Sequence, residues 1–259
     1  MTREVAWFSQ SSDRAASMSK IQDALRKIQS RTPTAPAPRD NGEETATLAK
    51  ISVEQLPDEK DSSKTISTKI VQIHRDRLIE EGFLAPEEQE RMLADQYRLI
   101  KRPLVDIAMG RAADHPRHAN LIMVASALPG DGKTFNGINL ALSMSVEEDS
   151  SVLLVDADVP KPHVSTLFEV NGEIGLIDVL TDPALDISDA ILRTDIPGLS
   201  ILPAGKRSEL STELLASRRM VKVLDELSTS DPNRIVVFDS PPLLAASEAP
   251  VLASQMGQI

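Results

Sequence analysis

The chain has 259 residues and a net charge of −11, because 39 acidic residues outnumber 28 basic ones. This balance argues against nucleic-acid binding, since a phosphate backbone is met by basic surfaces. The absence of cysteine excludes disulfides, thiolate metal sites and cysteine nucleophiles, and every apolar run is shorter than the ~20 residues that span a bilayer.

The first 85 residues are expected to form an appended N-terminal segment. Ile21, Leu25 and Ile28 recur at helical spacing, which predicts a short amphipathic helix over about residues 19–29. Residues 31–63 combine proline, small polar residues and charge, a composition typical of a flexible linker. We therefore expect a helical and partly disordered segment over residues 1–85, followed by one main domain over residues 86–259.

The main domain is predicted to alternate helices and strands. Its first helix should cover residues 86–102, because proline and two glutamates suit a first turn and Pro103 stops the helix. Apolar runs predict strands over residues 121–126, 152–156, 199–202 and 235–238. Amphipathic patterns predict helices over residues 134–146, 176–180, 185–192 and 213–227. This alternation is typical of a three-layer α/β/α fold with a mostly parallel sheet covered on both faces.

A phosphate-binding loop follows the first of these strands. The stretch ALPGDGKT, residues 127–134, matches the P-loop pattern, with Ala127 where a glycine is usual. Backbone N–H groups at its glycines can converge on phosphate oxygens, Lys133 can reach the outer phosphates, and the Thr134 hydroxyl can ligate Mg²⁺. The alternative is a glycine-containing turn without a ligand, which the preceding strand and following amphipathic helix disfavour. We predict a P-loop NTPase that binds ATP and Mg²⁺ through Pro129, Gly130, Asp131, Gly132, Lys133, Thr134 and Phe135.

Two further strands end in aspartate. Asp156 and Asp158 follow the strand SVLLV, and Asp239 follows the strand RIVVF. Acids at the carboxyl ends of parallel strands face the crevice where a P-loop opens, although a single such aspartate is more often a turn or helix cap. We predict that Asp239 is a Walker B acid on Mg²⁺, with Asp158 and Thr134 also at the metal. Asp156 is predicted to act as a base or orienting group for an incoming hydroxyl, whereas His163 is expected to be a surface residue.

Four blocks of the sequence together resemble the bacterial tyrosine autokinases of exopolysaccharide and capsule loci, particularly the exosortase-associated branch. The blocks are ASALPGDGKTFNGINLALSMS, VLLVDADVPKPHVSTLFEVNGEIGLIDVL, LPAGKRSELSTELLAS and RIVVFDSPPLLAASEAPVLA, within about residues 95–259. The resemblance implies that Lys133 and Thr134 form the Walker A pair, Asp156 and Asp158 a second Walker-type motif, and Asp239 the Walker B acid. It implies transfer of the ATP γ-phosphoryl group to tyrosine hydroxyls of a neighbouring subunit, with Lys133 and the three aspartates as the catalytic residues.

The resemblance also implies partners. In this branch the kinase is separate from its transmembrane partner, so we expect a cytoplasmic protein held at the inner membrane by a polysaccharide co-polymerase. These kinases typically carry Glu-x-x-Arg-x-x-Arg in a ring-like oligomer. Asp95, Arg98 and Lys101 stand at that spacing and predict a homo-oligomer, with a solvated charged helix face as the alternative.

The sequence departs from the family pattern in three places. Pro160 stands where an arginine is frequent, and Lys161 after it would replace that arginine only in part. The chain has a single tyrosine, Tyr97, so the tyrosine-rich tail of these kinases is not in it. The sequence stops where the family begins another core strand, so we expect a truncated chain of marginal stability that lacks the closing strands, the adenine-contacting segment and the tail.

Three other functions remain open from the sequence. A partition or cell-division ATPase shares the fold, but usually carries a lysine early in the P-loop where Leu128 stands. A nucleotide-dependent scaffold of a membrane co-polymerase would need little chemistry, and a single tyrosine is compatible with it. A metabolic small-molecule kinase is disfavoured, because the sequence shows no lid or acceptor pocket.

Overall fold

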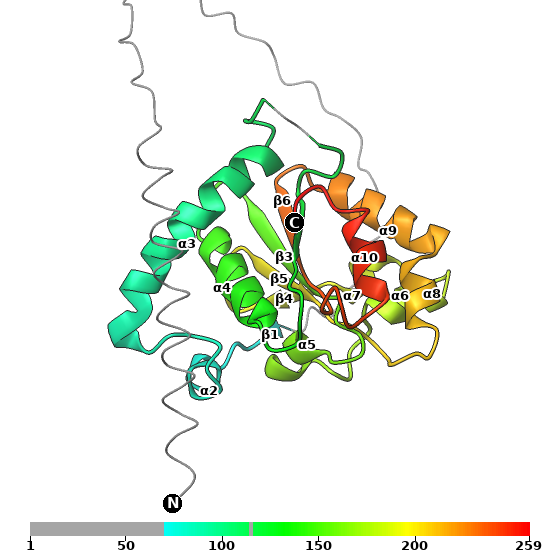
Figure 1. The fold of residues 1–259 in the computed structure, drawn as a ribbon, viewed down its shortest axis with the longest axis horizontal. Coiled ribbons are helices and arrows are strands. Elements are labelled where there is room, and N and C mark those ends of the chain that lie inside the picture. The colour runs from blue at the N-terminus through cyan, green and yellow to red at the C-terminus, as the bar shows by residue number, and fades with distance from the viewer. Residues whose placement is uncertain (1–69, 114–115) are drawn as a thin grey trace, which may run out of the picture. The chain divides into compact units, whose positions relative to one another are not determined.

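A computed structural model describes residues 70–113 and 116–259, so the helix expected over residues 19–29 and the linker expected over residues 31–63 lie outside the described residues. Within the described part, helices cover both faces of a central sheet (Figure 1). The strands are β1 (Ile70–Val71), β2 (Leu121–Val124), β3 (Ser151–Asp156), β4 (Leu192–Thr194), β5 (Leu199–Leu202) and β6 (Arg234–Asp239). The helices are α2 (Arg75–Glu80), α3 (Glu87–Ala108), α4 (Lys133–Ser145), α5 (His163–Leu167), α6 (Leu176–Thr181), α7 (Ile187–Ala190), α8 (Ser211–Leu215), α9 (Arg218–Thr229) and α10 (Glu248–Ala253).

The sheet is mostly parallel, as predicted. Its order among the described strands is β1-β4-β5-β3-β6-β2, and β4 with β5 is the antiparallel pair. The four strands predicted from apolar runs are β2, β3, β5 and β6, with ends that shift by one or two residues. Because β6 lies between β3 and β2, the carboxyl ends of these three strands meet at one edge.

The strands are buried on both faces, which explains their near-continuous apolar sequences. Side chains alternate along a strand, so Val152 and Leu154 of β3 enter one core while Leu153 and Val155 enter the other. The first core lies beneath α3 and α4, and the second beneath α6, α9 and α10. The three-layer α/β/α architecture predicted from the sequence is confirmed.

The predicted end of the first long helix at residue 102 is wrong, because α3 continues through Pro103 to Ala108. Proline removes one backbone donor and disfavours a helical residue before it. Pro103 lies on the exposed side of α3, whereas Val105 and Ala108 beyond it are buried in the core. Burial of this last turn offsets the local cost of the proline.

Two other helix predictions need correction. The helix expected over residues 213–227 is two helices, α8 and α9, because Ser217 leaves the helical conformation and its hydroxyl accepts a hydrogen bond from the Met220 N–H. The helix expected over residues 185–192 is only the short α7, since Leu192 already begins β4 and pairs with Ile201 of β5. Serine at a helix start and sheet pairing override the helical periodicity in these segments.

Residues 70–85 pack with the sheet, although the main domain was predicted to start at residue 86. Ile70 and Val71 form β1, which pairs in parallel with β4. Leu78 of α2 is 1% exposed, and the Ile73 N–H donates to Asp195 Oδ1 at 3.0 Å. Residues 70–85 therefore belong to the packed unit.

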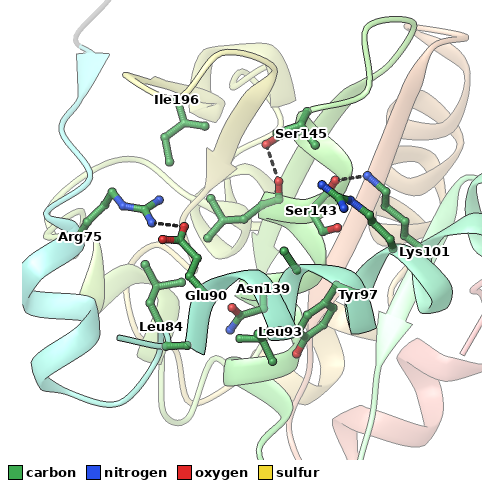
Figure 2. A pocket seen from close by; sticks show the side chains of 15 residues that line it. Arg75, Leu84, Glu90, Leu93, Tyr97, Lys101, Asn139, Ser143, Ser145 and Ile196 are labelled. Atoms are coloured by element: carbon green, nitrogen blue, oxygen red, sulfur yellow. Dashed lines mark hydrogen bonds and ion pairs between the residues drawn. The ribbon is translucent and has the colours of Figure 1, made fainter. Parts of the chain in front are cut away.

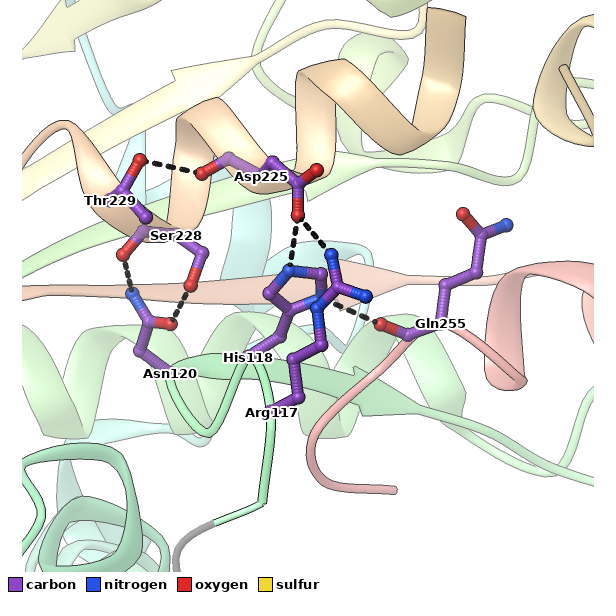
Figure 3. A network of polar contacts seen from close by, with 7 residues as sticks. All are labelled: Arg117, His118, Asn120, Asp225, Ser228, Thr229 and Gln255. Carbon is purple, nitrogen blue, oxygen red and sulfur yellow. Dashed lines mark hydrogen bonds and ion pairs between the residues drawn. The ribbon is translucent and has the colours of Figure 1, made fainter. Parts of the chain in front are cut away.

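The amino end of β2 is tied to α9 and to the residues after α10 by a polar network (Figure 3). Asp225 of α9 accepts hydrogen bonds from His118 Nε2 at 2.8 Å and Arg117 at 2.7 Å, and these bonds hold its pKa below the usual value. His118 Nδ1 faces the carbonyl oxygen of Gln255 at 3.2 Å, and the Met123 N–H of β2 donates to the Gln258 carbonyl.

None of the helices in the described part of the chain combines the length and the apolar character that a membrane span requires.

Candidate functional site

The P-loop connects β2 to the start of α4, as the sequence predicts. Gly130 and Gly132 have φ values of +86° and +93°, which place their backbones in the left-handed region that glycine adopts most readily. The Asp131 carboxylate accepts a hydrogen bond from the Leu128 N–H at 2.9 Å and so closes the loop on itself. The loop therefore presents the amino end of a 13-residue helix, which is suited to binding phosphate.

Asp239 contacts the P-loop directly. The Thr134 hydroxyl donates to Asp239 Oδ2 at 2.7 Å, across 105 residues of sequence. Asp239 is aligned with Val124 of β2 on one side and with Asp156 of β3 on the other. The predicted Walker A threonine and Walker B acid thus meet at one edge of the sheet.

Asp156 is held from the other side by α5. Its Oδ2 accepts hydrogen bonds from the Ser165 N–H and the Ser165 hydroxyl, both at 2.7 Å. Ser165 in turn accepts a bond from the Ala204 N–H at 3.0 Å, so it links β3 with the segment after β5. Ser165 was not singled out from the sequence, because it does not follow a strand, although it lies in the second block that resembles the family.

Burial dominates the electrostatics of the three acids. Asp156 and Asp239 are fully buried, and desolvation raises the pKa of Asp156 to about 7 and that of Asp239 to about 6. Desolvation also raises the pKa of Asp158, while the Lys161 N–H and the Lys133 ammonium act to lower it. Ionising any of these three acids therefore destabilises the folded protein unless a cation lies nearby.

The donor set fits Mg²⁺. Asp239 Oδ1 is buried without a hydrogen-bond partner among the described residues, and so is Asp156 Oδ1. Mg²⁺ prefers oxygen ligands and usually takes one or two carboxylates together with substrate phosphates. Thr134, Asp158 and Asp239 could supply that set. The described residues contain no cluster of three or more His, Cys, Asp and Glu side chains placed to hold a metal by themselves.

A cavity of about 480 Å³ opens above the P-loop. The predicted residues Pro129, Gly130, Gly132, Lys133, Thr134, Phe135 and Asp158 line it. Asp131 does not, since its carboxylate caps the loop, and Asp156 and Asp239 lie beneath the cavity rather than on its wall. The other lining residues were not predicted as site residues, although Pro160, Lys161 and His163 were noted in the sequence; they are Phe83, Pro160, Lys161, His163, Pro241, Pro242, Ala245 and Ala246.

His163 was expected to be a surface residue, and it is exposed but faces this cavity together with Lys161. Both act to lower the pKa of Asp158. The basic side of the cavity thus comes from the segment after β3 as well as from the P-loop, and Lys161 occupies it beside Pro160 where the family often has arginine.

The charged residues of α3 divide into two groups. Asp95 and Arg98 are exposed and pair with each other at 2.7 Å. Lys101 is 5% exposed and forms an ion pair with Glu147 at 2.6 Å, just after α4. Lys101 thus attaches α3 to its own domain, which corrects the expectation that all three residues are available for an oligomer contact.

A P-loop at the start of α4, a threonine bonded to a strand-end aspartate and a basic cavity define a P-loop nucleotide-binding protein. The chain belongs to the AAA domain family, whose model matches residues 119–255. It is 29% identical over 181 residues to Tyrosine-protein kinase YwqD of Bacillus subtilis, and the match covers 70% of this chain and 72% of that protein. It is 32% identical over 139 residues to a Klebsiella pneumoniae protein named Putative tyrosine-protein kinase in cps region, covering 53% of this chain and 19% of that protein.

A solved structure shows the same fold. The kinase domain of Escherichia coli tyrosine kinase ETK matches with a TM-score of 0.55 and 27% identity, covering 63% of this chain and 60% of that chain. The relatives and structural neighbours are bacterial tyrosine kinases, so the family resemblance found in the sequence is confirmed. The chain spans most of YwqD but about a fifth of the Klebsiella protein.

Proposed function

We propose that this protein is an ATP-dependent protein-tyrosine autokinase that regulates exopolysaccharide polymerisation or export. The observation that carries the proposal is the bond between Thr134 and Asp239 beneath a cavity lined by Lys133 and Asp158. The names of the relatives support the choice of tyrosine as acceptor and of a capsule locus as context.

The residues would divide the chemistry as follows. The P-loop amides and Lys133 would bind the β- and γ-phosphates, while Thr134, Asp158 and Asp239 would hold Mg²⁺, which supplies charge neutralisation. The γ-phosphorus–oxygen bond to ADP would break as a bond to the tyrosine oxygen forms, and the phenolic proton would pass to a carboxylate. Asp158 is the acid on the cavity wall, whereas Asp156 is better placed to orient the segment that carries Asp158, Lys161 and His163 through its bonds to Ser165.

Tyr97 is a poor candidate for the acceptor of this reaction. Tyr97 is the single tyrosine of the chain, and it is 5% exposed. A transmembrane polysaccharide co-polymerase would be the membrane partner and would place the kinase at the cytoplasmic face of the inner membrane. The exposed Asp95–Arg98 pair remains available for a homo-oligomer.

A phosphotyrosine assay tests this function. The protein is incubated with labelled ATP, Mg²⁺ and a glutamate–tyrosine copolymer, in parallel with Lys133→Met and with Lys222→Met, which changes an exposed lysine of α9. We expect label on tyrosine with the wild type and Lys222→Met but not with Lys133→Met. Phosphate release without tyrosine labelling would instead support a partition-type ATPase, and nucleotide-dependent assembly without either would support a scaffold.

A further inference from the structure

The buried face of α3 lies along α4, the helix that the P-loop begins. A cavity of about 320 Å³ separates parts of the two helices, and Tyr97 and Lys101 of α3 line it together with Asn139 and Ser143 of α4 (Figure 2). Tyr97 is 5% exposed, and its hydroxyl donates to Asn136 Oδ1 at 2.9 Å. Burial raises the pKa of Tyr97 to about 12, so the hydroxyl keeps its proton at physiological pH.

Asn136 connects Tyr97 to the P-loop through hydrogen bonds. Its side-chain Nδ2 donates to the Gly132 carbonyl oxygen at 2.9 Å, and its backbone N–H donates to the same oxygen at 2.9 Å. One amide orientation satisfies both ends, because the carbonyl of Gly132 can only accept. The oxygen of the Asn136 side chain must therefore face Tyr97, as it does here.

The Gly132 carbonyl and the Lys133 N–H belong to the same planar peptide unit. A fixed carbonyl direction therefore fixes the direction of the Lys133 N–H, which is one of the free donors at the amino end of α4. Gly132 has a φ of +93°, and glycine has few steric limits on its backbone angles. A hydrogen bond to its carbonyl therefore restricts this peptide unit more than it would restrict a peptide unit inside a helix.

We propose that Tyr97 is a positioning residue that acts through Asn136 to hold the peptide between Gly132 and Lys133 in its phosphate-binding orientation. The bond between Tyr97 and Asn136 is thereby coupled to nucleotide affinity. This inference rests on the proposed function only in that nucleotide is the ligand of the P-loop.

Lys101 provides a matched control on the same helix interface. It donates to the Ser143 carbonyl and pairs with Glu147, near the carboxyl end of α4. Ser143 is seven residues beyond Asn136, which is about 10 Å along a helix. Loss of Lys101 therefore weakens α3 docking without touching the chain of bonds from Tyr97 to Gly132.

The test compares Tyr97→Phe with Lys101→Met by calorimetric titration with Mg²⁺–ADP. Removing one hydroxyl should weaken binding by about 2- to 10-fold, the range of a single net hydrogen bond, and leave the aromatic packing intact. Lys101→Met should bind like the wild type even if its melting temperature falls further. In an Asn136→Ala background, Tyr97→Phe should cause no additional loss.

Hydrogen exchange separates this proposal from the proposed function. In the ligand-free protein, the backbone N–H of Asn136, which donates to the Gly132 carbonyl oxygen, should exchange faster in Tyr97→Phe than in the wild type or in Lys101→Met. Unchanged exchange and affinity in Tyr97→Phe would overturn the coupling, and so would equal losses in Tyr97→Phe and Lys101→Met. A wild type that binds no nucleotide would overturn the proposed function, while the exchange comparison would still decide the role of Tyr97.

Discussion

Replacing Asp156 by asparagine tests whether the buried acids of the site destabilise the ligand-free fold. Asp156 is 0% exposed, and desolvation raises its pKa from 3.8 to about 7. A raised carboxyl pKa means that the folded protein holds this proton more tightly than the unfolded chain does. Stability from the protonated form is therefore complete below the unfolded pKa, and is lost as the pH rises to about 7.

The expected size follows from this shift. A change from 3.8 to about 7 is about 3 pH units, or about 4 kcal/mol of unfolding free energy at ~1.4 kcal/mol per unit. Asparagine keeps an oxygen to accept the two bonds from Ser165, but it buries an NH₂ group that costs about 1–3 kcal/mol if it stays unpaired. We expect Asp156→Asn to be more stable than the wild type by about 2 kcal/mol at pH 8, and this gain should decline steadily below pH 7.

Urea unfolding of the ligand-free protein in EDTA, at several pH values between 5 and 8, measures this difference. Asp149→Asn is the matched control, because Asp149 is exposed and should give no gain at any pH. A variant less stable than the wild type at pH 8, or a gain that stays constant from pH 5 to pH 8, would refute the reasoning. Because asparagine keeps the oxygen that accepts from Ser165, the same variant should retain phosphoryl transfer if Asp156 only orients the segment after β3, and lose it if Asp156 is the base.

Three further substitutions probe the site and the turn geometry. Thr134→Val removes the donor to Asp239 Oδ2, so it should lower the unfolding free energy by about 1–3 kcal/mol. Measured by calorimetry, nucleotide binding should weaken more in the presence of Mg²⁺ than in EDTA. Equal weakening under both conditions would argue against a shared metal site. Gly205→Ala puts a Cβ 2.4 Å from Asp178 Oδ2 at a φ of +83°, and should cost more than 2 kcal/mol in urea unfolding, whereas Gly82→Ala has φ +79° with no atom within 4 Å and should cost about 1 kcal/mol. Equal losses in the two glycine variants would show that backbone strain alone decides both.

The phosphate-binding part of the site could be predicted because its chemistry is contiguous in sequence. Lys133 and Thr134 directly follow the glycines of the loop. The strand before the loop and the helix after it each show their own periodicity. The position of Asp239 near the P-loop could also be predicted, because parallel strands bring their carboxyl ends to one edge of the sheet. Its bond to Thr134 then follows from the sheet order, which places β6 beside β2.

The rest of the site depends on contacts between distant segments. Phe83 lies on the cavity wall because Asn139 of α4 holds its carbonyl oxygen at 2.8 Å, and no local pattern indicates that contact. His163 faces the cavity because the loop after β3 folds back, with the Lys161 N–H donating to the Asp158 carbonyl. A sequence pattern identifies the residue types that chemistry needs, but it does not show which loop returns to the site.

The same limit explains the errors in the helices. Helical periodicity continues across Ser217, where the break depends on one hydroxyl that caps α9. Proline predicts an end at residue 103, but tertiary packing of Val105 and Ala108 extends α3 beyond it. Local propensity is a weak constraint of up to a few kcal/mol, and burial of one helical turn is enough to override it.

The position of β6 distinguishes the surroundings of Asp239 from those of Asp158. Asp239 lies on a strand flanked on both sides, so its backbone and side chain are fixed before any ligand binds. Asp158 follows the end of β3, reaches the cavity wall and depends on a loop for its orientation. Fixed, buried charge reduces the reorganisation needed when phosphate and metal arrive, whereas an acid on a loop can follow the substrate. The fixed, buried carboxylate of Asp239 destabilises the ligand-free fold. Nucleotide with Mg²⁺ should therefore stabilise this protein through Asp239 more than through Asp158.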